Sequence, residues 1–241
     1  IAAYAARAGL KAKIYVPENV SGQKFNQTLF YGVDVVKVPG SRERVTEEAQ
    51  MPGEGKFYIG HVWHPFFRDG IRSLAYELVE QFNWSIHERI YVPVSAGTLL
   101  LGLLSGLSHL RDSGIIEPIP KVVACQTRQV SPLYHRFKGL VYTPPENVRS
   151  IADALVSVNP PLLGLMVEGL KEVNGDVVIV EEEEIISAFK GLARNGLFVE
   201  PSSAVAYAAY RKQLQNRDVP VDTKTVIVLT GTGLKTPVVP R

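Results

Sequence analysis

The sequence predicts an α/β fold in which a parallel sheet is covered by helices on both faces. Short apolar runs alternate with segments of helical periodicity from Lys13 to Leu229. The runs are apolar throughout, which is typical of strands that are buried on both faces of a parallel sheet. No repeat, low-complexity tract or long linker interrupts this alternation.

The individual elements follow from these patterns in chain order. An opening helix over residues 1–7 ends near Gly9, because glycine readily adopts the left-handed conformation in which many helices end. The apolar runs predict strands at 13–16, 33–38, 57–59, 90–94, 122–125, 177–180 and 226–229. The periodic segments predict helices at 22–31, 71–82, 97–110, 162–173, 181–194 and 202–214, and residues 41–51 are helix or loop.

The polar stretch from 39 to 56 is the best candidate for a domain boundary. We therefore expect part of a smaller N-terminal α/β domain at residues 1–56 and a larger α/β domain at residues 57–241. The sequence opens with IAAYAARAG, which has no initiator Met and no capping residue before its helix. We expect an N-terminal portion to precede it.

Composition narrows the class of protein. The 241 residues are 46% hydrophobic, which is ample for a sizeable core, and the net charge of +2 gives no case for binding nucleic acid or a membrane surface. A single cysteine excludes an internal disulfide and fits a reducing compartment. No apolar run approaches the roughly 20 residues that span a bilayer. We expect a cytoplasmic protein that acts on a small molecule.

Open parallel sheets bind ligands at the carboxyl ends of their strands. After the strand that ends at Val94, the segment VPVSAGTLLLG starts a helix with small residues, which let the backbone approach a ligand. Free N–H groups at a helix start favour an anion such as phosphate. An ordinary N-cap by Ser95 or Thr98 explains this stretch equally well. The segment lacks the lysine of a P-loop and the spacing of a dinucleotide fingerprint.

Two further segments near the C-terminus mark the end of a predicted strand and the start of a predicted helix. In VIVLTGTGLK an apolar strand stops at threonines and glycines, which indicates either a tight turn or a backbone cradle for a cofactor. In FVEPSSAVAYAAY an alanine-rich, thin helix starts, and capping by Ser202 with close packing explains this segment by itself.

Three other polar features indicate no metal site or nucleophile. The run Glu181 to Glu184 offsets the dipole of a helix that starts there. The stretch from His61 to His64 has no further ligands to complete a metal site, so a pocket or packing role is favoured. Cys125 lies in a predicted strand and is expected to be a buried core thiol.

Taken in order, these stretches resemble one family. The succession AAYAARAGLKAKIYVP, HPFFRDGIRSLAYELVEQ, VPVSAGTLLLG, GLFVEPSSA and LTGTGLK is similar to the threonine synthase branch of the fold type II pyridoxal-phosphate (PLP) enzymes, which have the tryptophan synthase β-like fold. The resemblance covers nearly the whole chain. EPSSA followed by LTGTGLK is its most specific part.

The resemblance implies a cofactor site. The backbone of Ser95, Ala96, Gly97, Thr98 and Leu99 would hold the phosphate of PLP, and Thr230, with Gly231 beside it, would lie at the pyridine nitrogen. A neutral hydroxyl does not favour a protonated pyridine, so the ring is a weaker electron sink, which suits β- and γ-elimination or replacement. The resemblance also implies a cofactor between the two domains and a homodimer.

The implied substrate-binding residues are His61, Arg68 and Ser202. Threonine synthases that use phosphohomoserine typically carry Asn-Ser and an Arg in the segment that corresponds to HVWHPFFRDG. Here His61, Val62 and Phe67 stand in those places, Arg68 is one position off, and Ser95 replaces a glycine of the phosphate loop. The implied activity is β/γ-elimination or replacement on an amino acid such as O-phosphohomoserine, with the leaving group left open.

No catalytic residue is assigned, because the family's Schiff-base lysine and its Ser/Thr-Gly-Asn substrate loop belong before Ile1. Two alternatives therefore stay open. One is a truncated, inactive PLP-fold chain that serves as a binding module. The other is a nucleotide-binding α/β protein, although no GxGxxG with a following acidic ribose partner stands in the sequence.

Overall fold

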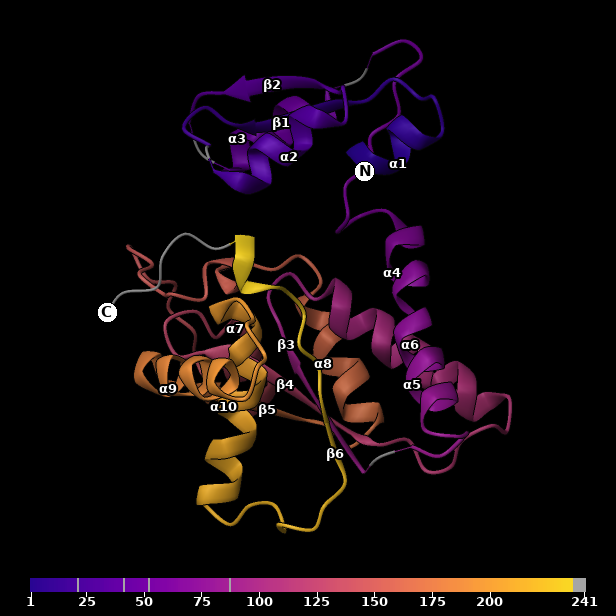
Figure 1. Ribbon diagram of the computed structural model, residues 1–241, viewed down its shortest axis with the longest axis vertical. Coiled ribbons are helices and arrows are strands. Elements are labelled where there is room, and N and C mark those ends of the chain that lie inside the picture. Colours follow the sequence, from indigo (N-terminus) through magenta and orange to yellow (C-terminus); the bar gives the residue numbers. More distant parts are fainter. Residues whose placement is uncertain (21, 41, 52, 87, 236–241) are drawn as a thin grey trace. The chain divides into compact units, whose positions relative to one another are not determined.

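The computed structural model describes residues 1–20, 22–40, 42–51, 53–86 and 88–235. Contacts divide the chain into two compact units, a first over Ile1–Ile59 and a second over Gly60–Leu234 (Figure 1). In the described ranges, no helix is both long and apolar enough to cross a membrane.

The first unit is a small βαβ arrangement with flanking helices. Strands β1 (Lys13–Pro17) and β2 (Asp34–Val38) pair in parallel, with Lys13 opposite Asp34. Helix α2 (Gln23–Phe30) connects them, as a parallel pair requires. Helices α1 (Ala2–Arg7) and α3 (Arg42–Gln50) complete the unit. Val38 is the only buried apolar residue among the described residues of this unit.

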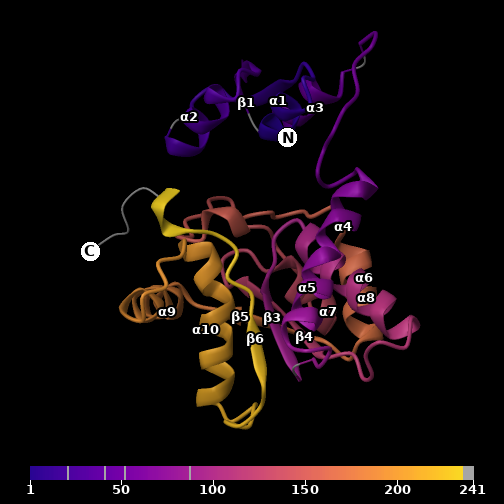
Figure 2. The ribbon, with the colours of Figure 1, turned by 45° about the vertical axis from the view of Figure 1, so that its right-hand side comes forward.

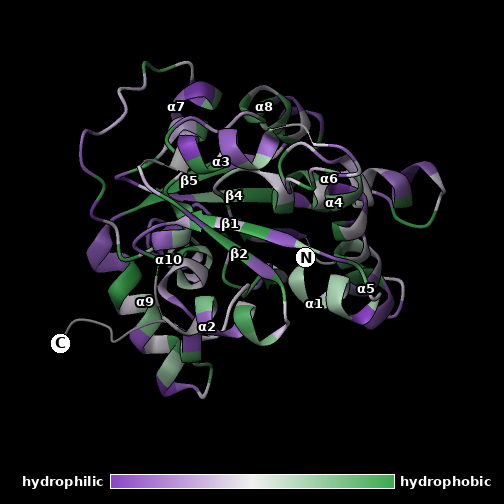
Figure 3. Cartoon of the chain, turned by 90° about the horizontal axis from the view of Figure 1, so that it is seen from above, coloured by the Kyte–Doolittle hydropathy of each residue, from purple (hydrophilic) through white to green (hydrophobic). Residues whose placement is uncertain are grey.

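The second unit is built on a four-stranded parallel sheet with the order β5-β4-β3-β6. These strands are β3 (Arg89–Pro93), β4 (Lys121–Thr127), β5 (Asp176–Val180) and β6 (Thr225–Ile227). Hydrophobic residues run along β4 and β5 (Figure 3). Because both faces of the sheet are covered, the strands read as continuous apolar runs in the sequence.

Helices cover both faces of this sheet (Figures 1 and 2). On one face α10 (Pro201–Gln215) contacts all four strands, and α9 (Glu182–Arg194) packs against it. The layer on the opposite face holds α6 (Thr98–Asp112) with its neighbours α4 (Pro65–Ile71), α5 (Ser73–Gln81) and α8 (Leu163–Glu172), and α7 (Pro132–Lys138), which packs against α8 and β5. The core between this layer and the sheet is made of apolar residues such as Val92, Leu103 and Met166.

The predicted α/β fold with a parallel sheet is confirmed, and most predicted elements are present within a few residues. One prediction is wrong, because residues 57–59 form no strand. Their side chains are exposed, so this apolar run is not part of a buried sheet. The predicted helix at 71–82 is α5 alone, while α4, α7 and the short 3-10 helices Asp153–Leu155 and Gly233–Lys235 were not predicted.

Candidate functional site

The carboxyl ends of β3 and β6 lie next to each other in the second unit. The two strands pair in parallel, and beyond the ladder the Val228 N–H donates to the Tyr91 carbonyl at 3.0 Å. The loops that follow, Val94 to Gly97 and Val228 to Thr232, therefore leave the sheet side by side. This edge is where ligands of open parallel sheets bind.

The loop after β3 presents a row of unsatisfied backbone donors. Gly97 is the N-cap of α6 in a left-handed conformation (φ 97°, ψ −4°), and no side chain caps the helix. Within the described ranges, no N–H from Ser95 to Leu100 donates a hydrogen bond. A Cβ at residue 97 would come within 2.4 Å of the Met166 sulfur, so glycine is needed for both backbone conformation and packing. The proposed cap by Ser95 or Thr98 is therefore wrong.

The loop after β6 is fastened to the start of α10. The Thr230 N–H donates to the buried Ser203 Oγ at 2.8 Å, and the Glu200 N–H donates to the Gly231 carbonyl at 2.9 Å. A Cβ on Gly231 would lie 2.4 Å from Glu200 Oε1. The loop is therefore fixed, while the side chain of Thr230 is exposed and its hydroxyl makes no hydrogen bond within the described part of the chain.

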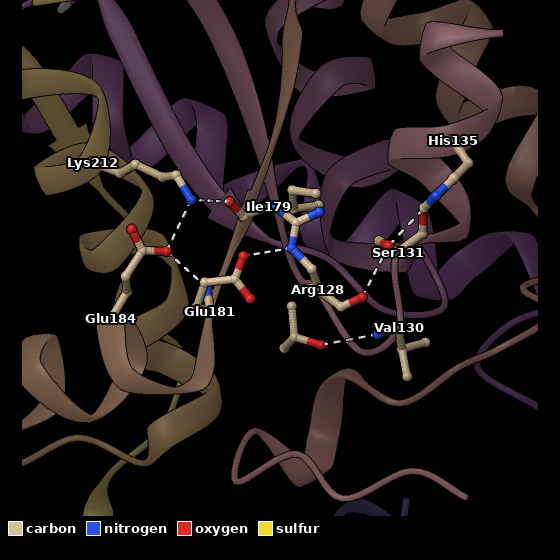
Figure 4. Close-up of polar contacts among 9 residues, drawn as sticks. Arg128, Val130, Ser131, His135, Ile179, Glu181, Glu184 and Lys212 are labelled. Carbon is tan, nitrogen blue, oxygen red and sulfur yellow. Dashed lines mark hydrogen bonds and ion pairs between the residues drawn. The ribbon is translucent and has the colours of Figure 1, made fainter. Parts of the chain in front are cut away.

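The loops after β4 and β5 are closed by their own side chains (Figure 4). Arg128 pairs with Glu181, and Lys212 pairs with Glu184 at 3.0 Å. Glu181 and Glu184 form a capping box on α9, which confirms that the acidic run serves the helix start. Nearby, the Val130 N–H donates to Thr127 Oγ1 at 3.2 Å. These contacts are structural and present few open donors to a ligand.

The remaining predicted site residues lie in different surroundings. Ser202 is buried, and its Oγ accepts from the Ala154 N–H at 3.1 Å, so it ties α10 to the 3-10 helix and does not cap α10, whose N-cap is Glu200. His61 is exposed in the turn before α4, and its ring contacts Phe67. Arg68, in α4, lines a groove together with Leu101, Leu104, Ser105 and Ser108 of α6.

Burial changes the acidity of two side chains beneath this edge. Cys125 is fully buried, and loss of solvent raises the pKa of its thiol, which confirms an inert core thiol. Burial also raises the pKa of Tyr91 to about 12, and its hydroxyl donates to Gln213 in α10. Neither group is a candidate nucleophile. In the described ranges, no group of three or more His, Cys, Asp or Glu residues is placed to hold a metal ion.

The β3–β6 edge fits the phosphate of PLP. Unbonded N–H groups at the start of a helix, together with the positive end of its dipole, favour an anion with several acceptor oxygens. The exposed Thr230 hydroxyl on the neighbouring loop is able to meet a ring nitrogen. A cofactor with phosphate and pyridine groups matches this pair of features.

A family comparison agrees with this chemistry. The model of the family described as "Pyridoxal-phosphate dependent enzyme" matches residues 1–231. The chain belongs to this family. PLP is therefore the cofactor of its relatives, and fold type II is their fold.

Threonine synthases are among the chain's similar relatives. That of Methanocaldococcus jannaschii is 32% identical over 98% of the chain, and that of Methanosarcina acetivorans is 27% identical over 98%. The chain spans 60% of the length of each of these two proteins. Among solved structures, serine racemase from Dictyostelium discoideum is 25% identical with a TM-score of 0.78, and the match covers 96% of the chain and 71% of that protein. A threonine deaminase from T.th. is 21% identical with a TM-score of 0.80, over 100% of the chain and 74% of that protein, and supports the fold alone.

Sequence reasoning missed Ser203, the residue that fixes the backbone of this family member's Thr230. It stands in the EPSSA segment, where only its neighbour Ser202 was singled out. The sequence did contain a signal for a second role, because two adjacent serines at the start of a helix point in different directions and so contact different neighbours. It became specific only when the fold brought residues 27 positions apart together.

Proposed function

We propose that the protein is a PLP-dependent lyase of the threonine synthase type. It acts by β/γ-elimination or replacement on an amino acid with a leaving group, such as O-phosphohomoserine. The observation that carries the proposal is the row of unbonded N–H groups from Ser95 to Leu100 beside the exposed hydroxyl of Thr230. The similarity to threonine synthases supports the reaction type.

The backbone from Ser95 to Leu99 binds the phosphate of the cofactor. Its N–H groups donate to the phosphate oxygens, and the start of α6 adds the positive end of the helix dipole. The hydroxyls of Ser95 and Thr98 are near enough in sequence to add donors. Gly97, in its left-handed conformation, is the N-cap residue that leads the chain into the first turn of α6.

Thr230 would hold the ring nitrogen of the cofactor through its exposed hydroxyl, and Gly231 beside it keeps room for Glu200. PLP, when bound, supplies the electron sink for bond breaking next to the substrate's α-carbon. Thr230 offers the ring nitrogen a neutral hydroxyl, which does not hold a proton there. Ser203 keeps Thr230 in place through the bond to its N–H.

The predicted substrate-binding residues differ in whether their side chains are available to a ligand. Among the predicted substrate-binding residues, Ser202 already uses its hydroxyl on Ala154 and Asp153, whereas His61 is exposed. The role of Arg68 in substrate binding, the domains at 1–56 and 57–241, the homodimer and the cytoplasmic location stay predictions.

The phosphate site is tested by titrating the purified protein with PLP and following the fluorescence of its tryptophans. Ala96→Asp places a carboxylate where it competes with phosphate for the same N–H groups, so we expect PLP binding to weaken at least about tenfold. Ser113→Asp adds the same charge at the other end of α6 and serves as the control. Equal affinities for both variants would contradict the proposal.

Activity separates the proposed reaction from those in the names of the structural neighbours. Phosphate release from O-phosphohomoserine supports the threonine synthase type, whereas ammonia release from L-threonine or L-serine assigns a deaminase type. The assay uses a protein that includes the preceding segment with the expected Schiff-base lysine, and PLP binding by that protein without turnover of any of these substrates favours the binding-module alternative.

A further inference from the structure

Part of the connection between α7 and α8 lies at the end of the second unit at which α10 begins (Figure 2). We call its residues 149–155 the strap. The regular structure of the strap is the 3-10 helix Asp153–Leu155, whose last residue is buried, as is the preceding Ala152. A segment with so little regular structure depends on other bonds to hold its backbone in place.

Glu182, in the first turn of α9, holds one end of the strap. Its Oε1 accepts from the Ser150 hydroxyl at 2.7 Å, and its Oε2 accepts from the Ile151 N–H at 2.9 Å. Beside these bonds the Arg149 N–H donates to Gln129 Oε1 at 3.0 Å. Hydrogen bonds to a carboxylate are stronger than those to a neutral acceptor, so Glu182 is the main anchor of this end.

The other end of the strap is bound to the first turn of α10. The Ala154 N–H donates to Ser202 Oγ at 3.1 Å, and the Ser202 hydroxyl donates to Asp153 Oδ1 at 3.4 Å. Ser202 is buried, so water does not replace these partners. The position of the 3-10 helix and that of the first turn of α10 therefore depend on each other.

The next residue of α10 holds the loop that carries Thr230. Ser203 Oγ accepts from the Thr230 N–H at 2.8 Å. Two consecutive serines thus join one helical turn to the strap on one side and to the Thr230 loop on the other. Hydrogen-bond networks and rigid helical elements transmit displacements between the groups that they connect.

We propose that Glu182 is a positioning residue for Thr230. It clasps the strap, and the strap fixes the first turn of α10 through Ser202. Ser203, in the same turn, then fixes the backbone of Thr230. This inference rests on the proposed function, in which the Thr230 hydroxyl meets the ring nitrogen of PLP. Glu182 belongs to the closed half of the sheet edge and acts at the open half only through these bonds.

The test is isothermal titration of the purified protein with PLP and with 1-deazapyridoxal 5′-phosphate, in which carbon replaces the ring nitrogen. The parent protein prefers PLP, because only PLP offers Thr230 a ring nitrogen. Glu182→Ala removes both bonds to the strap, so we expect the affinity for PLP to fall at least about fivefold. The affinity for the analogue should stay within about twofold, because the phosphate site after β3 is untouched.

Glu183→Ala is the matched control. Glu183 is exposed in the same turn of α9, and it forms no hydrogen bond or ion pair with another described residue. Its replacement removes the same charge from the helix start, so the loss of interaction with the helix dipole is common to both variants. We expect both affinities to stay unchanged. Circular dichroism and urea unfolding verify that each variant folds.

Further variants test the route through the strap. Ser202→Ala breaks the far end of the strap, so it should reproduce the loss of PLP affinity in Glu182→Ala. Because both changes act through one strap, the double variant should lose no more affinity than the weaker-binding single variant. Glu182→Gln keeps one acceptor oxygen and should recover part of the affinity.

Several outcomes overturn the proposal. Equal losses for PLP and the analogue in Glu182→Ala would show a general loss of structure. Unchanged PLP affinity in that variant, an equal loss in Glu183→Ala, or additive losses in the double variant would also overturn it. If the parent binds PLP and the analogue equally, Thr230 does not meet the ring nitrogen, and that part of the proposed function falls together with this inference. If the parent prefers PLP and Glu182→Ala keeps the full preference, the inference alone fails.

Discussion

At the carboxyl ends of β3 and β6 the backbone N–H groups from Ser95 to Leu100 have no acceptor within the described chain, whereas at the ends of β4 and β5 side chains close the loops. On the second side, Glu184 accepts from the Glu181 N–H at 2.7 Å, and Glu182 accepts from the Ile151 N–H at 2.9 Å. A protein that can satisfy its loop donors locally, and does so at one half of an edge, leaves the other half open for a ligand.

Gly97→Ala gives the largest expected effect on this comparison. The Cβ combines left-handed strain with a clash against Met166, so we expect the free energy of unfolding to fall by about 2–4 kcal/mol. Gly114→Ala is the control, since Gly114 has φ +70° but nothing within 4 Å of the added Cβ. Urea unfolding of both variants measures the difference. Equal losses of unfolding free energy in the two variants would show that the Met166 side chain moves aside. In that case packing against Met166 does not determine the conformation of the loop.

Tyr91→Phe tests the support beneath the open half. Burial raises the pKa of Tyr91 from 10.0 to about 12. The folded state therefore holds the proton more tightly, and this stability is full below pH 10 and is lost as pH rises through about 12. The loss reaches roughly 2–3 kcal/mol. Urea unfolding between pH 9 and 12 should show a smaller alkaline loss in Tyr91→Phe than in the parent, and an identical slope would contradict the prediction.

Glu184→Ala on the closed half gives the smallest effect. It removes one arm of the capping box and the partner of Lys212, so we expect a loss of about 1 kcal/mol in the free energy of unfolding. The affinity for PLP should not change. A decrease in PLP affinity would show that the loops after β4 and β5 also take part in binding, and would contradict the distinction between an open and a closed half of the edge.

The sequence predicted the fold well where periodicity was strong. Long helices and buried strands have a clear apolar pattern, so α6, α10 and β3 were found. Helices α4 and α7 have seven residues each, too few to show a period, although Pro65 and Pro132 at their first turns were available signals. The expected strand at 57–59 failed because an apolar run gives no information about a pairing partner.

The candidate site was predictable only in part. The small residues after β3 suggested an anion site, and the family resemblance placed Thr230 beside it. The sequence could not show that Gly97, and not Ser95 or Thr98, caps α6, because both arrangements fit the same residues. The bond from Thr230 to Ser203 depends on the tertiary fold, which brings the end of β6 against α10.

The fastening of the last loop to the start of α10 has a consequence for protein engineering. Val199 pairs with Thr232, Glu200 bonds to Gly231, and Ser203 holds Thr230, so the two segments form one graft unit. A chimaera that takes the TGTG segment from one relative and the EPSS segment from another combines two segments whose mutual hydrogen bonds were not selected together. Exchange of the loop after β6 between members of this family should therefore move both segments together.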